Sequence, residues 1–312
     1  MKIVITGAAG FIGSHLTEHL LAKGHSITGI DNFDDFYNPD VKRDNIKTAL
    51  QNDNFKIIQA DIRNGEIMDT ILADGADAVV HLAARAGVRP SIENPKLYTD
   101  VNVNGTVVML EAAKKHNIQK FILGSSSSVY GNNKKIPFSE KDNVDFPISP
   151  YAATKKAGEL ICHTYHHLYN IHITTLRFFT VYGPRQRPDL AIHKFARLIE
   201  LNKPVPIYGD GTMQRDFTYI DDIIQGTTAA IENCRGCEIY NLGESTPISV
   251  NNLISELEKA LGKNAKRRYL PLQPGDVERT YADISKAEKL LGYQPNTSFE
   301  KGLEVFVKWL RR

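Results

Sequence analysis

Short apolar stretches of strand length alternate with helical patterns through the first half of the chain. The apolar stretches are rich in β-branched residues and lie at Lys2–Thr6, Ser26–Ile30, Phe55–Gln59, Ala78–Leu82, Lys120–Gly124 and Ile173–Phe178. Helical periodicity occurs between them, at Phe11–Ala22, Lys42–Gln51, Glu66–Leu72, Lys96–His116 and Tyr151–Leu168. Strands that are apolar along their whole length are typical of a parallel sheet covered on both faces. The pattern therefore predicts a doubly wound, Rossmann-type α/β domain with right-handed crossovers.

The pattern changes after about residue 180. Proline, glycine and aromatic residues are frequent in Pro184–Tyr219, and helical patterns at Asn251–Leu261 and Ser285–Leu291 are separated by loops. The strand-like run Glu238–Leu242 is expected to return to the first domain. We therefore expect a dinucleotide-binding domain of residues 1–179 and about 216–243, and a smaller, mostly helical substrate lobe of residues 180–215 and 244–312.

Composition narrows the class of protein. Of 312 residues, 24% are charged and 42% hydrophobic, as in ordinary globular proteins, and the net charge of +2 argues against a nucleic-acid partner. No apolar run approaches the roughly 20 residues that span a bilayer. The three cysteines, Cys162, Cys234 and Cys237, favour a reducing compartment, so we expect a cytoplasmic protein without a membrane segment. Cys234 and Cys237 have metal-ligand spacing, but no second pair completes a zinc site.

A glycine-rich segment, Thr6–Gly13, follows the first predicted strand and opens the first predicted helix. This context is typical of a dinucleotide site, where free backbone N–H groups and the helix dipole meet a pyrophosphate. Asp31 ends the second strand, where a carboxylate binds the adenosine ribose, and neither Asn32 nor Phe33 offers a cation to a 2′-phosphate. The segment thus favours NAD over NADP, with Asp61 and Ile62 near the adenine; the alternative is a structural turn that binds no ligand.

Two further segments carry reactive side chains. Tyr151 and Lys155 are four residues apart on a predicted helix and therefore share a face, where an ammonium lowers the pKa of a phenol and makes it a base for a sugar hydroxyl. The serine cluster, Ser125–Ser128, follows the fifth strand, at the edge where such sheets bind ligands. Alone, either segment is compatible with a surface helix or a polar turn. Their joint occurrence after a dinucleotide motif favours an active site.

Together with these segments, His81–Ala84, Asn102–Thr106, Tyr182–Pro184, Arg215–Asp221 and Pro274–Asp276 resemble the NAD-dependent epimerase/dehydratase branch of the extended short-chain dehydrogenase/reductase family, nearly end to end. The resemblance implies that Tyr151 is the catalytic base and acid, Lys155 its activator and Ser126 its hydroxyl partner. It implies tightly bound NAD, held by Gly7, Gly10, Phe11, Ile12, Gly13, Asp31, Asn32, Asp61, Ile62, Leu82, Ala83, Ala84, Asn102, Ser125, Tyr151 and Lys155. It also implies a UDP-sugar substrate, bound by Arg89, Ser126, Ser127, Ser128, Tyr151, Thr180, Arg187, Lys194, Phe195, Tyr208, Arg215, Asp276 and Arg279.

The reaction follows from what the serine cluster lacks. Dehydratases and decarboxylases of the family carry an acidic group before the Val-Tyr-Gly motif, where this chain has Ser127 and Ser128. Reversible oxidation and reduction at C4, through a transient 4-keto sugar, is the simplest chemistry that remains. Three segments, Ala84–Arg89, Phe178–Pro184 and Arg187–Ala191, are similar to UDP-glucuronate 4-epimerases, whereas Arg185-Gln186 replaces the Trp-Gly usual in that group.

We therefore predict 4-epimerisation of UDP-glucuronate to UDP-galacturonate, with Ser127, Ser128, Thr180 and Arg187 around the carboxylate. The alternatives are a UDP-glucose 4-epimerase, then a UDP-glucuronate decarboxylase and, from another class, a protein that binds NAD without turnover. By analogy with the family, helices Lys96–His116 and Tyr151–Leu168 are expected to form the interface of a homodimer.

Overall fold

Seven parallel strands form the central sheet in the computed structural model, which describes residues 1–272 and 279–312. The strands are β1 (Lys2–Thr6), β2 (Ser26–Asp31), β3 (Phe55–Gln59), β4 (Ala78–His81), β5 (Lys120–Ser126), β6 (His172–Phe178) and β10 (Cys237–Leu242). Their order is β10-β6-β5-β4-β1-β2-β3. The chain moves outward from β1 to β3 and then returns to place β4 on the other side of β1. The crevice beyond the carboxyl ends of β1 and β4 is thus the switch point at which such sheets bind ligands.

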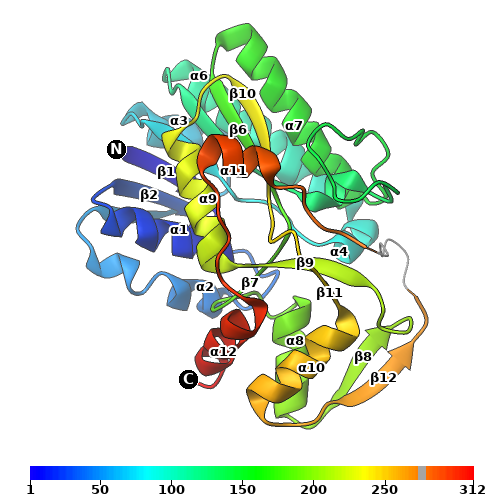
Figure 1. Cartoon of the computed structure of the whole chain (residues 1–312). Helices are drawn as coiled ribbons and strands as arrows, with labels where there is room; N and C mark the ends of the chain where they lie inside the picture. The colour runs from blue at the N-terminus through cyan, green and yellow to red at the C-terminus, as the bar shows by residue number, and fades with distance from the viewer. Residues whose placement is uncertain (273–278) are drawn as a thin grey trace.

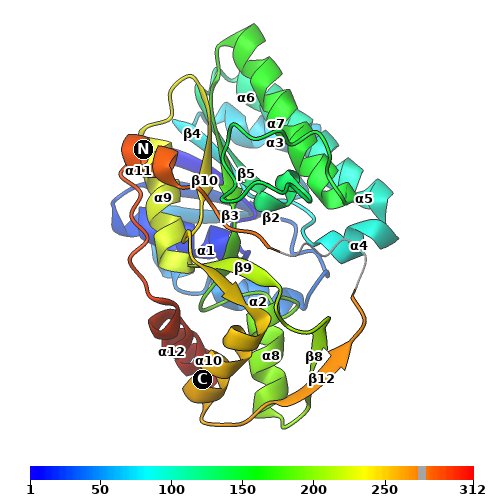
Figure 2. The same cartoon turned by 45° about the vertical axis from the view of Figure 1, so that its right-hand side comes forward.

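Helices cover both faces of this sheet (Figure 1 and Figure 2). One face carries α1 (Phe11–Ala22) and α9 (Ile220–Glu232), and the other carries α3 (Gly65–Ala73), α6 (Gly105–Lys115) and α7 (Pro150–Tyr169). Successive residues of a strand consequently belong to different apolar clusters. One cluster contains Ile5, Val80 and Ile122, and the other contains Val4 and Val79. The predicted α/β class is confirmed, and the uninterrupted apolar strands are explained by burial on both sides.

Local sequence sets the ends of the helix that carries the predicted catalytic pair. The side chain of Ser149 accepts a hydrogen bond from the backbone N–H of Ala152 (3.2 Å), and Pro150 occupies the first turn of α7. The helix ends at Asn170, whose φ of 56° is left-handed. α7 is therefore fixed at both ends, and its first turn points towards the carboxyl edge of the sheet.

Two predicted helices are divided in the structure. Lys96–His116 is α5 (Pro95–Thr99), a π-helical turn η2 (Asp100–Asn104) and α6. Lys42–Gln51 is α2 (Pro39–Asn45) and a 3-10 turn, η1 (Ala49–Gln51). Short elements absent from the sequence expectation are α4 (Val88–Glu93) and η3 (Ser127–Tyr130). Periodicity alone misses these interruptions, because a π turn shifts the register by one residue without changing composition.

The second lobe lies below the sheet in Figure 1 and contains more strand than expected. Its helices are α8 (Ala191–Glu200), α10 (Val250–Leu261) and α12 (Phe299–Leu310), and α11 (Ser285–Leu291) packs back against α9 and β10. β8 (Pro204–Tyr208) pairs with β12 (Lys266–Leu270), and β9 (Gln214–Tyr219) lies between β7 (Thr180–Tyr182) and β11 (Pro247–Ser249). β11 has three residues and β12 is mostly exposed, so neither has the apolar run that identifies a buried strand. The domain boundaries given above stay a prediction. Within the described ranges, no helix has the length and apolar character to cross a membrane.

Candidate active site

A cleft of ≈ 510 Å³ lies at the carboxyl edge of the sheet, between the sheet and the second lobe. It brings together the ends of β1, β2, β4 and β5, the first turn of α7 and the segments around Thr180 and Arg187. Every residue predicted to bind the cofactor lines this cleft except Asn102. Of the residues predicted for the substrate, Ser126, Ser127, Ser128, Tyr151, Thr180 and Arg187 line it.

The glycine-rich segment forms a close turn between β1 and α1. Gly7 has a left-handed φ of 71°, and a Cβ placed on Gly13 would lie 2.1 Å from the carbonyl oxygen of Gly7. The first turn of α1 has no side-chain cap and no acidic residue, so its backbone N–H groups face the cleft without an internal acceptor. The turn thus fits a pyrophosphate, which needs both the close backbone approach and the positive end of the helix dipole.

Gly13→Ala is expected to lower the NAD content of the purified protein at least about tenfold. The added Cβ would meet backbone atoms of Gly7, which are not the end of a flexible side chain, so the pyrophosphate turn must open. The measurement is NAD released by acid from a known amount of protein. Gly65→Ala is the control, because Gly65 also lies in the first turn of a helix without a left-handed φ, and a Cβ there meets only Val108, at 4.0 Å. A Gly13→Ala protein with full NAD content contradicts the assignment of this turn.

Asp31 is held in place by the glycine turn, and the turn and Asp31 are predicted to bind the same cofactor. Its carboxylate accepts hydrogen bonds from the N–H groups of Ala9 (3.2 Å) and Phe33 (2.8 Å). Lys42 of α2, also buried, places its Nζ 3.6 Å from the same carboxylate. The sequence alone does not predict a cation at this position. Because Lys42 is paired with Asp31, this corner presents no excess positive charge of the kind that a 2′-phosphate requires.

The two sides of the predicted adenine site are also fixed. Arg63 and Asn32 donate to the Asp61 carboxylate, and the Arg63 contacts hold the pKa of Asp61 down, at about 2. On the other side of the glycine turn, the hydroxyl of Thr6 accepts the N–H of Ala83 (3.1 Å). Asn102 supports the same loop from behind: its side chain accepts the N–H of Arg85 (2.7 Å) and donates to the Arg85 carbonyl (2.9 Å). Asn102 therefore shapes the loop, and its predicted cofactor contact remains a prediction.

Tyr151, Ser126 and Lys155 meet at the centre of the cleft. The phenol of Tyr151 lies beside Ser126, whose hydroxyl donates to that of Ser128 (3.1 Å), and the Nζ of Lys155 donates to the carbonyl of Gly124 (2.7 Å). Burial raises the pKa of Tyr151, while the neighbouring hydroxyl of Ser126 and the charge of Arg187 oppose that rise. Burial also lowers the pKa of Lys155 to about 8. The raised pKa of Tyr151 differs from the expectation, from sequence, of a lowered phenol pKa. The reason is that the cost of burying a phenolate exceeds the stabilisation that neighbouring groups give it.

Arg187 enters the sugar end of the cleft from the second lobe. Its Nε and Nη2 donate to the two oxygens of Asp189 (2.9 and 2.6 Å), and its guanidinium lies 5.4 Å from the ring centroid of Phe36. Thr180, Ser127 and Ser128 line the same end. One side-chain edge of Arg187 is thus occupied by Asp189, and its face is covered by Phe36, which leaves Nη1 for another acceptor.

Several residues predicted for the UDP portion lie outside this cleft. The guanidinium of Arg89 stacks 4.4 Å from the ring centroid of Tyr208 and so links α4 to β8. Arg215 lies on β9, which pairs with β11. Arg279 is exposed, and its guanidinium lies 5.0 Å from the ring centroid of Tyr281. Lys194 is exposed, whereas Phe195 is buried among the apolar residues of α8. Asp276 lies outside the described residues.

The cleft lining also includes residues to which the sequence assigned no role, among them Asp34, Phe36, Lys42 and Arg85. Asp34 accepts the Nη1 of Arg85 (2.8 Å), and the Arg85 guanidinium lies 5.4 Å from the Phe36 ring centroid. Their positions in the sequence could have indicated the cleft for three of them. Asp34 and Phe36 lie just after Asp31, and Arg85 directly follows Ala84, and both Asp31 and Ala84 are predicted cofactor residues. Away from the cleft, the described residues include no cluster of His, Cys, Asp and Glu suited to a metal ion, and the three cysteines are unbridged.

Comparison with known proteins gives a consistent set of relatives. A family model described as GDP-mannose 4,6 dehydratase matches residues 4–306. A UDP-glucuronate 4-epimerase from Thermodesulfobacterium geofontis is 48% identical over 308 residues, 98% of this chain and 95% of that protein. A crystal structure of UDP-glucuronic acid 4-epimerase from Bacillus cereus, in complex with UDP-glucuronic acid and NAD, is 44% identical with a TM-score of 0.94, over 100% and 99% of the two chains. A UDP-glucose 4-epimerase from Thermotoga maritima, solved with UDP-glucose, is 32% identical with a TM-score of 0.92, over 100% and 99%.

Proposed function

Because the chain belongs to the family described as GDP-mannose 4,6 dehydratase, within the extended short-chain dehydrogenases/reductases, we propose that it is an NAD-dependent UDP-glucuronate 4-epimerase. The observation that carries the proposal is the shared cleft. The glycine turn and Asp31 lie at one end, Tyr151, Ser126 and Lys155 at the centre, and Thr180 and Arg187 at the other end.

The residues of the cofactor end suit NAD. The N–H groups of α1 would hold the pyrophosphate, and Asp31 would accept hydrogen bonds from the adenosine ribose hydroxyls. When bound, NAD supplies a hydride acceptor that returns the same hydride within each turnover, so it must stay on the protein. The backbone supports this retention, because the turn and Asp31 are tied together by the bond from Ala9.

The chain's own task is to move a proton at the C4 oxygen. Tyr151 accepts that proton and later returns it, with the hydroxyl of Ser126 beside the phenol. The charge of Arg187 already opposes the rise in the phenol pKa. The positive charge of an oxidised nicotinamide, if bound at this end of the cleft, would favour the phenolate further and so lower the phenol pKa.

The cleft contains acids, but each of them is paired. Among the described lining residues, the carboxylates are those of Asp31, Asp34 and Asp61, which contact Lys42, Arg85 and Arg63 respectively. None comes from the segment of Ser127 and Ser128, where dehydratases and decarboxylases need an acid. This supports epimerisation over dehydration, although the family model is described by a dehydratase.

The sugar end suits a carboxylate at C5. Arg187 supplies a cation, and the hydroxyls of Thr180, Ser127 and Ser128 supply neutral donors. A 4-keto uronate is a β-keto acid that loses carbon dioxide readily when its carboxylate leaves the ring plane. Several donors on one carboxylate hold it in that plane, where the breaking bond overlaps poorly with the ketone.

The test is to incubate the purified protein with UDP-glucuronate and to separate the products. UDP-galacturonate is expected, without added NAD. A UDP-pentose with carbon dioxide would identify a decarboxylase, and turnover of UDP-glucose at a higher kcat/KM would identify a hexose epimerase. Bound NAD without turnover of any of these sugars would identify a binding protein.

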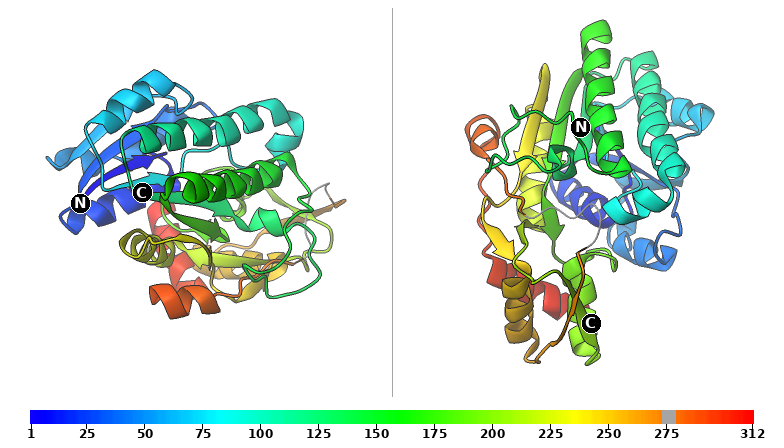
Figure 3. Two further views of the ribbon diagram at one scale, coloured as in Figure 1. Left: turned by 90° about the horizontal axis from the view of Figure 1, so that it is seen from above. Right: turned by 90° about the vertical axis from the view of Figure 1, so that its right-hand side faces the viewer.

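We also propose a cytoplasmic homodimer formed through α6 and α7, which lie side by side on the outer face of the sheet (Figure 3). Leu160 and Leu168, two helical turns apart on α7, are 55% and 63% exposed, and burial in a partner would remove that apolar surface from water. Sedimentation equilibrium should give twice the 34.9 kDa of the chain. Leu160→Glu together with Leu168→Glu should give the single chain; a monomeric parent protein contradicts the proposal.

A further inference from the structure

A buried carboxylate lies one helical turn beyond Lys155 and has no role in the site described so far. Glu159 is 5% exposed, and it follows Lys155 on α7 by the same four residues that separate Lys155 from Tyr151. Residues with this spacing share one face of a helix. The face of α7 that carries Tyr151 and Lys155 therefore continues to a buried carboxylate.

Glu159 is bound from two strands of the sheet. The Nε and Nη2 of Arg177, on β6, donate to its two oxygens (2.9 and 2.7 Å). The hydroxyl of Ser125, at the end of β5, donates to the same carboxylate (2.6 Å). Ser125 was predicted to contact the cofactor, but its hydroxyl is used here. Glu159 thus ties α7 to the strand that carries Ser126.

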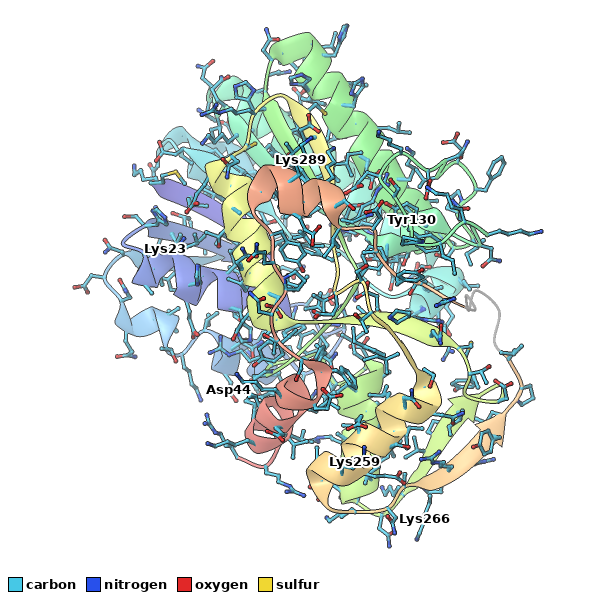
Figure 4. The ribbon with its side chains drawn as sticks, viewed as in Figure 1. Lys23, Asp44, Tyr130, Lys259, Lys266 and Lys289 are labelled. Atoms are coloured by element: carbon cyan, nitrogen blue, oxygen red, sulfur yellow. The ribbon has the colours of Figure 1, made fainter. Side chains whose placement is uncertain are left out.

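The network extends behind Arg177. Its Nη1 donates to the hydroxyl of Tyr130 (2.9 Å), which donates to the side chain of Asn241 on β10 (2.7 Å). Tyr130 is labelled in Figure 4, where it lies near the first turns of α7. Every side chain in this hydrogen-bonded network is buried and has a partner, so the Glu159 carboxylate has little freedom to move.

The charges around Lys155 come from three elements. On β4, His81 is buried, and burial lowers its pKa to about 3, so it is neutral. On β6, Arg177 is a buried cation. On α7, Tyr151 is uncharged while its pKa is raised, and Glu159 supplies the negative charge that opposes the effect of burial on Lys155. Without Glu159, two cations would remain in this buried region with no counter-charge among the groups named here.

We propose that Glu159 is a positioning residue of the active site: held by Arg177 and Ser125, it keeps the Lys155 ammonium charged beside Tyr151. The proposal rests on the proposed function only in assuming that the charged form of Lys155 supports turnover. Its structural part, the effect of one carboxylate on one lysine, is independent of the substrate.

The first experiment is the pH profile of kcat for Glu159→Gln. The amide keeps the size of the side chain and an acceptor for Ser125, but removes the charge. Lys155 should lose its proton at lower pH, so the alkaline limb of the profile should move towards acid by at least about one pH unit. Glu258→Gln, which removes a carboxylate paired with Arg267 in the second lobe, is the matched control and should leave the limb in place. A Glu159→Gln limb that coincides with the parent's overturns the proposal.

A second readout does not depend on turnover. Competitive acetylation, quantified peptide by peptide over a pH series, gives the pH at which Lys155 becomes reactive in each protein. That pH should fall in Glu159→Gln by the same amount as the kinetic limb. If the parent does not epimerise UDP-glucuronate, the proposed function fails, yet this measurement still decides the role of Glu159. An unchanged Lys155 reactivity overturns that role.

Glu159→Gln leaves Arg177 buried without its ion pair and so can fold poorly. The double variant Glu159→Gln/Arg177→Met removes both charges, and Tyr130 keeps its bond to Asn241. Both readouts are repeated on it. The reference for this variant is Arg177→Met alone, because the two proteins differ only in the carboxylate at position 159. A Lys155 that loses its proton at lower pH in the double variant than in Arg177→Met supports the proposal, whereas equal values contradict it.

Discussion

Tyr151→Phe is expected to lower kcat for UDP-glucuronate about 10³-fold while the NAD content stays unchanged. The substitution removes one oxygen from the cleft, and that oxygen is the group expected to accept and return the C4 proton. Loss of a positioned acid–base group costs about 10²–10⁴ in rate. The phenol lies beside Ser126 at the centre of the cleft, so the fold loses little besides that oxygen.

The same variant separates two accounts of the centre of the cleft. If the phenol moves the proton, mixing the variant with UDP-glucuronate should produce no transient absorbance of reduced nicotinamide. If Lys155 or a serine moves it, the transient should persist. Tyr98→Phe is the control, because the Tyr98 ring lies edge-on to that of Tyr151 (6.3 Å) and its hydroxyl donates to the Ala86 carbonyl. It should retain activity within about threefold. A Tyr151→Phe protein with more than a tenth of the parent kcat contradicts the assignment.

The parts of the site that sequence predicts are local. The glycine turn and the Tyr151/Lys155 pair each depend on residues within a few positions of one another, and Asp31 is recognised by its place at the end of the second strand. The strand predictions succeeded for the same reason: burial on both faces leaves an apolar run that needs no knowledge of the partner strand. Tyr151 and Lys155 accordingly line one cleft with Gly7 and Gly13.

The parts that sequence does not predict depend on pairing across the fold. Lys42 reaches Asp31 from the next helix, and Arg177 reaches Glu159 across 18 positions of sequence. The apparent pKa of Tyr151 is another case, because the helical spacing to Lys155 is local but the burial of the phenol is not. A charged residue with a buried partner has the same composition as one in solvent, so only the tertiary arrangement distinguishes them.

Arg187→Ala is expected to lower kcat/KM for UDP-glucuronate by at least about thirtyfold, with little loss for UDP-glucose. The first cost is loss of the charge pair that Arg187 would form with the uronate carboxylate. Truncating one partner of a buried, hydrogen-bonded charge pair costs about 2–5 kcal/mol, and each 1.36 kcal/mol is a factor of ten in kcat/KM. The structure adds a second cost. Without Arg187, the Asp189 carboxylate loses its two donors and faces the incoming uronate as a like charge. The neutral sugar meets no such repulsion.

The double variant Arg187→Ala/Asp189→Asn distinguishes these two costs. It should recover part of the loss for UDP-glucuronate, since the repulsive charge is gone, but not the part that depends on the guanidinium. Product analysis tests retention of the carboxylate: Arg187→Ala and Thr180→Ala should each release carbon dioxide and form a UDP-pentose that the parent does not form. If both variants keep the parent's ratio of kcat/KM values for the two sugars and give no pentose, the sugar end of the cleft does not recognise a carboxylate. In that case UDP-glucuronate would lose its place as the preferred substrate, while Tyr151 would keep its role.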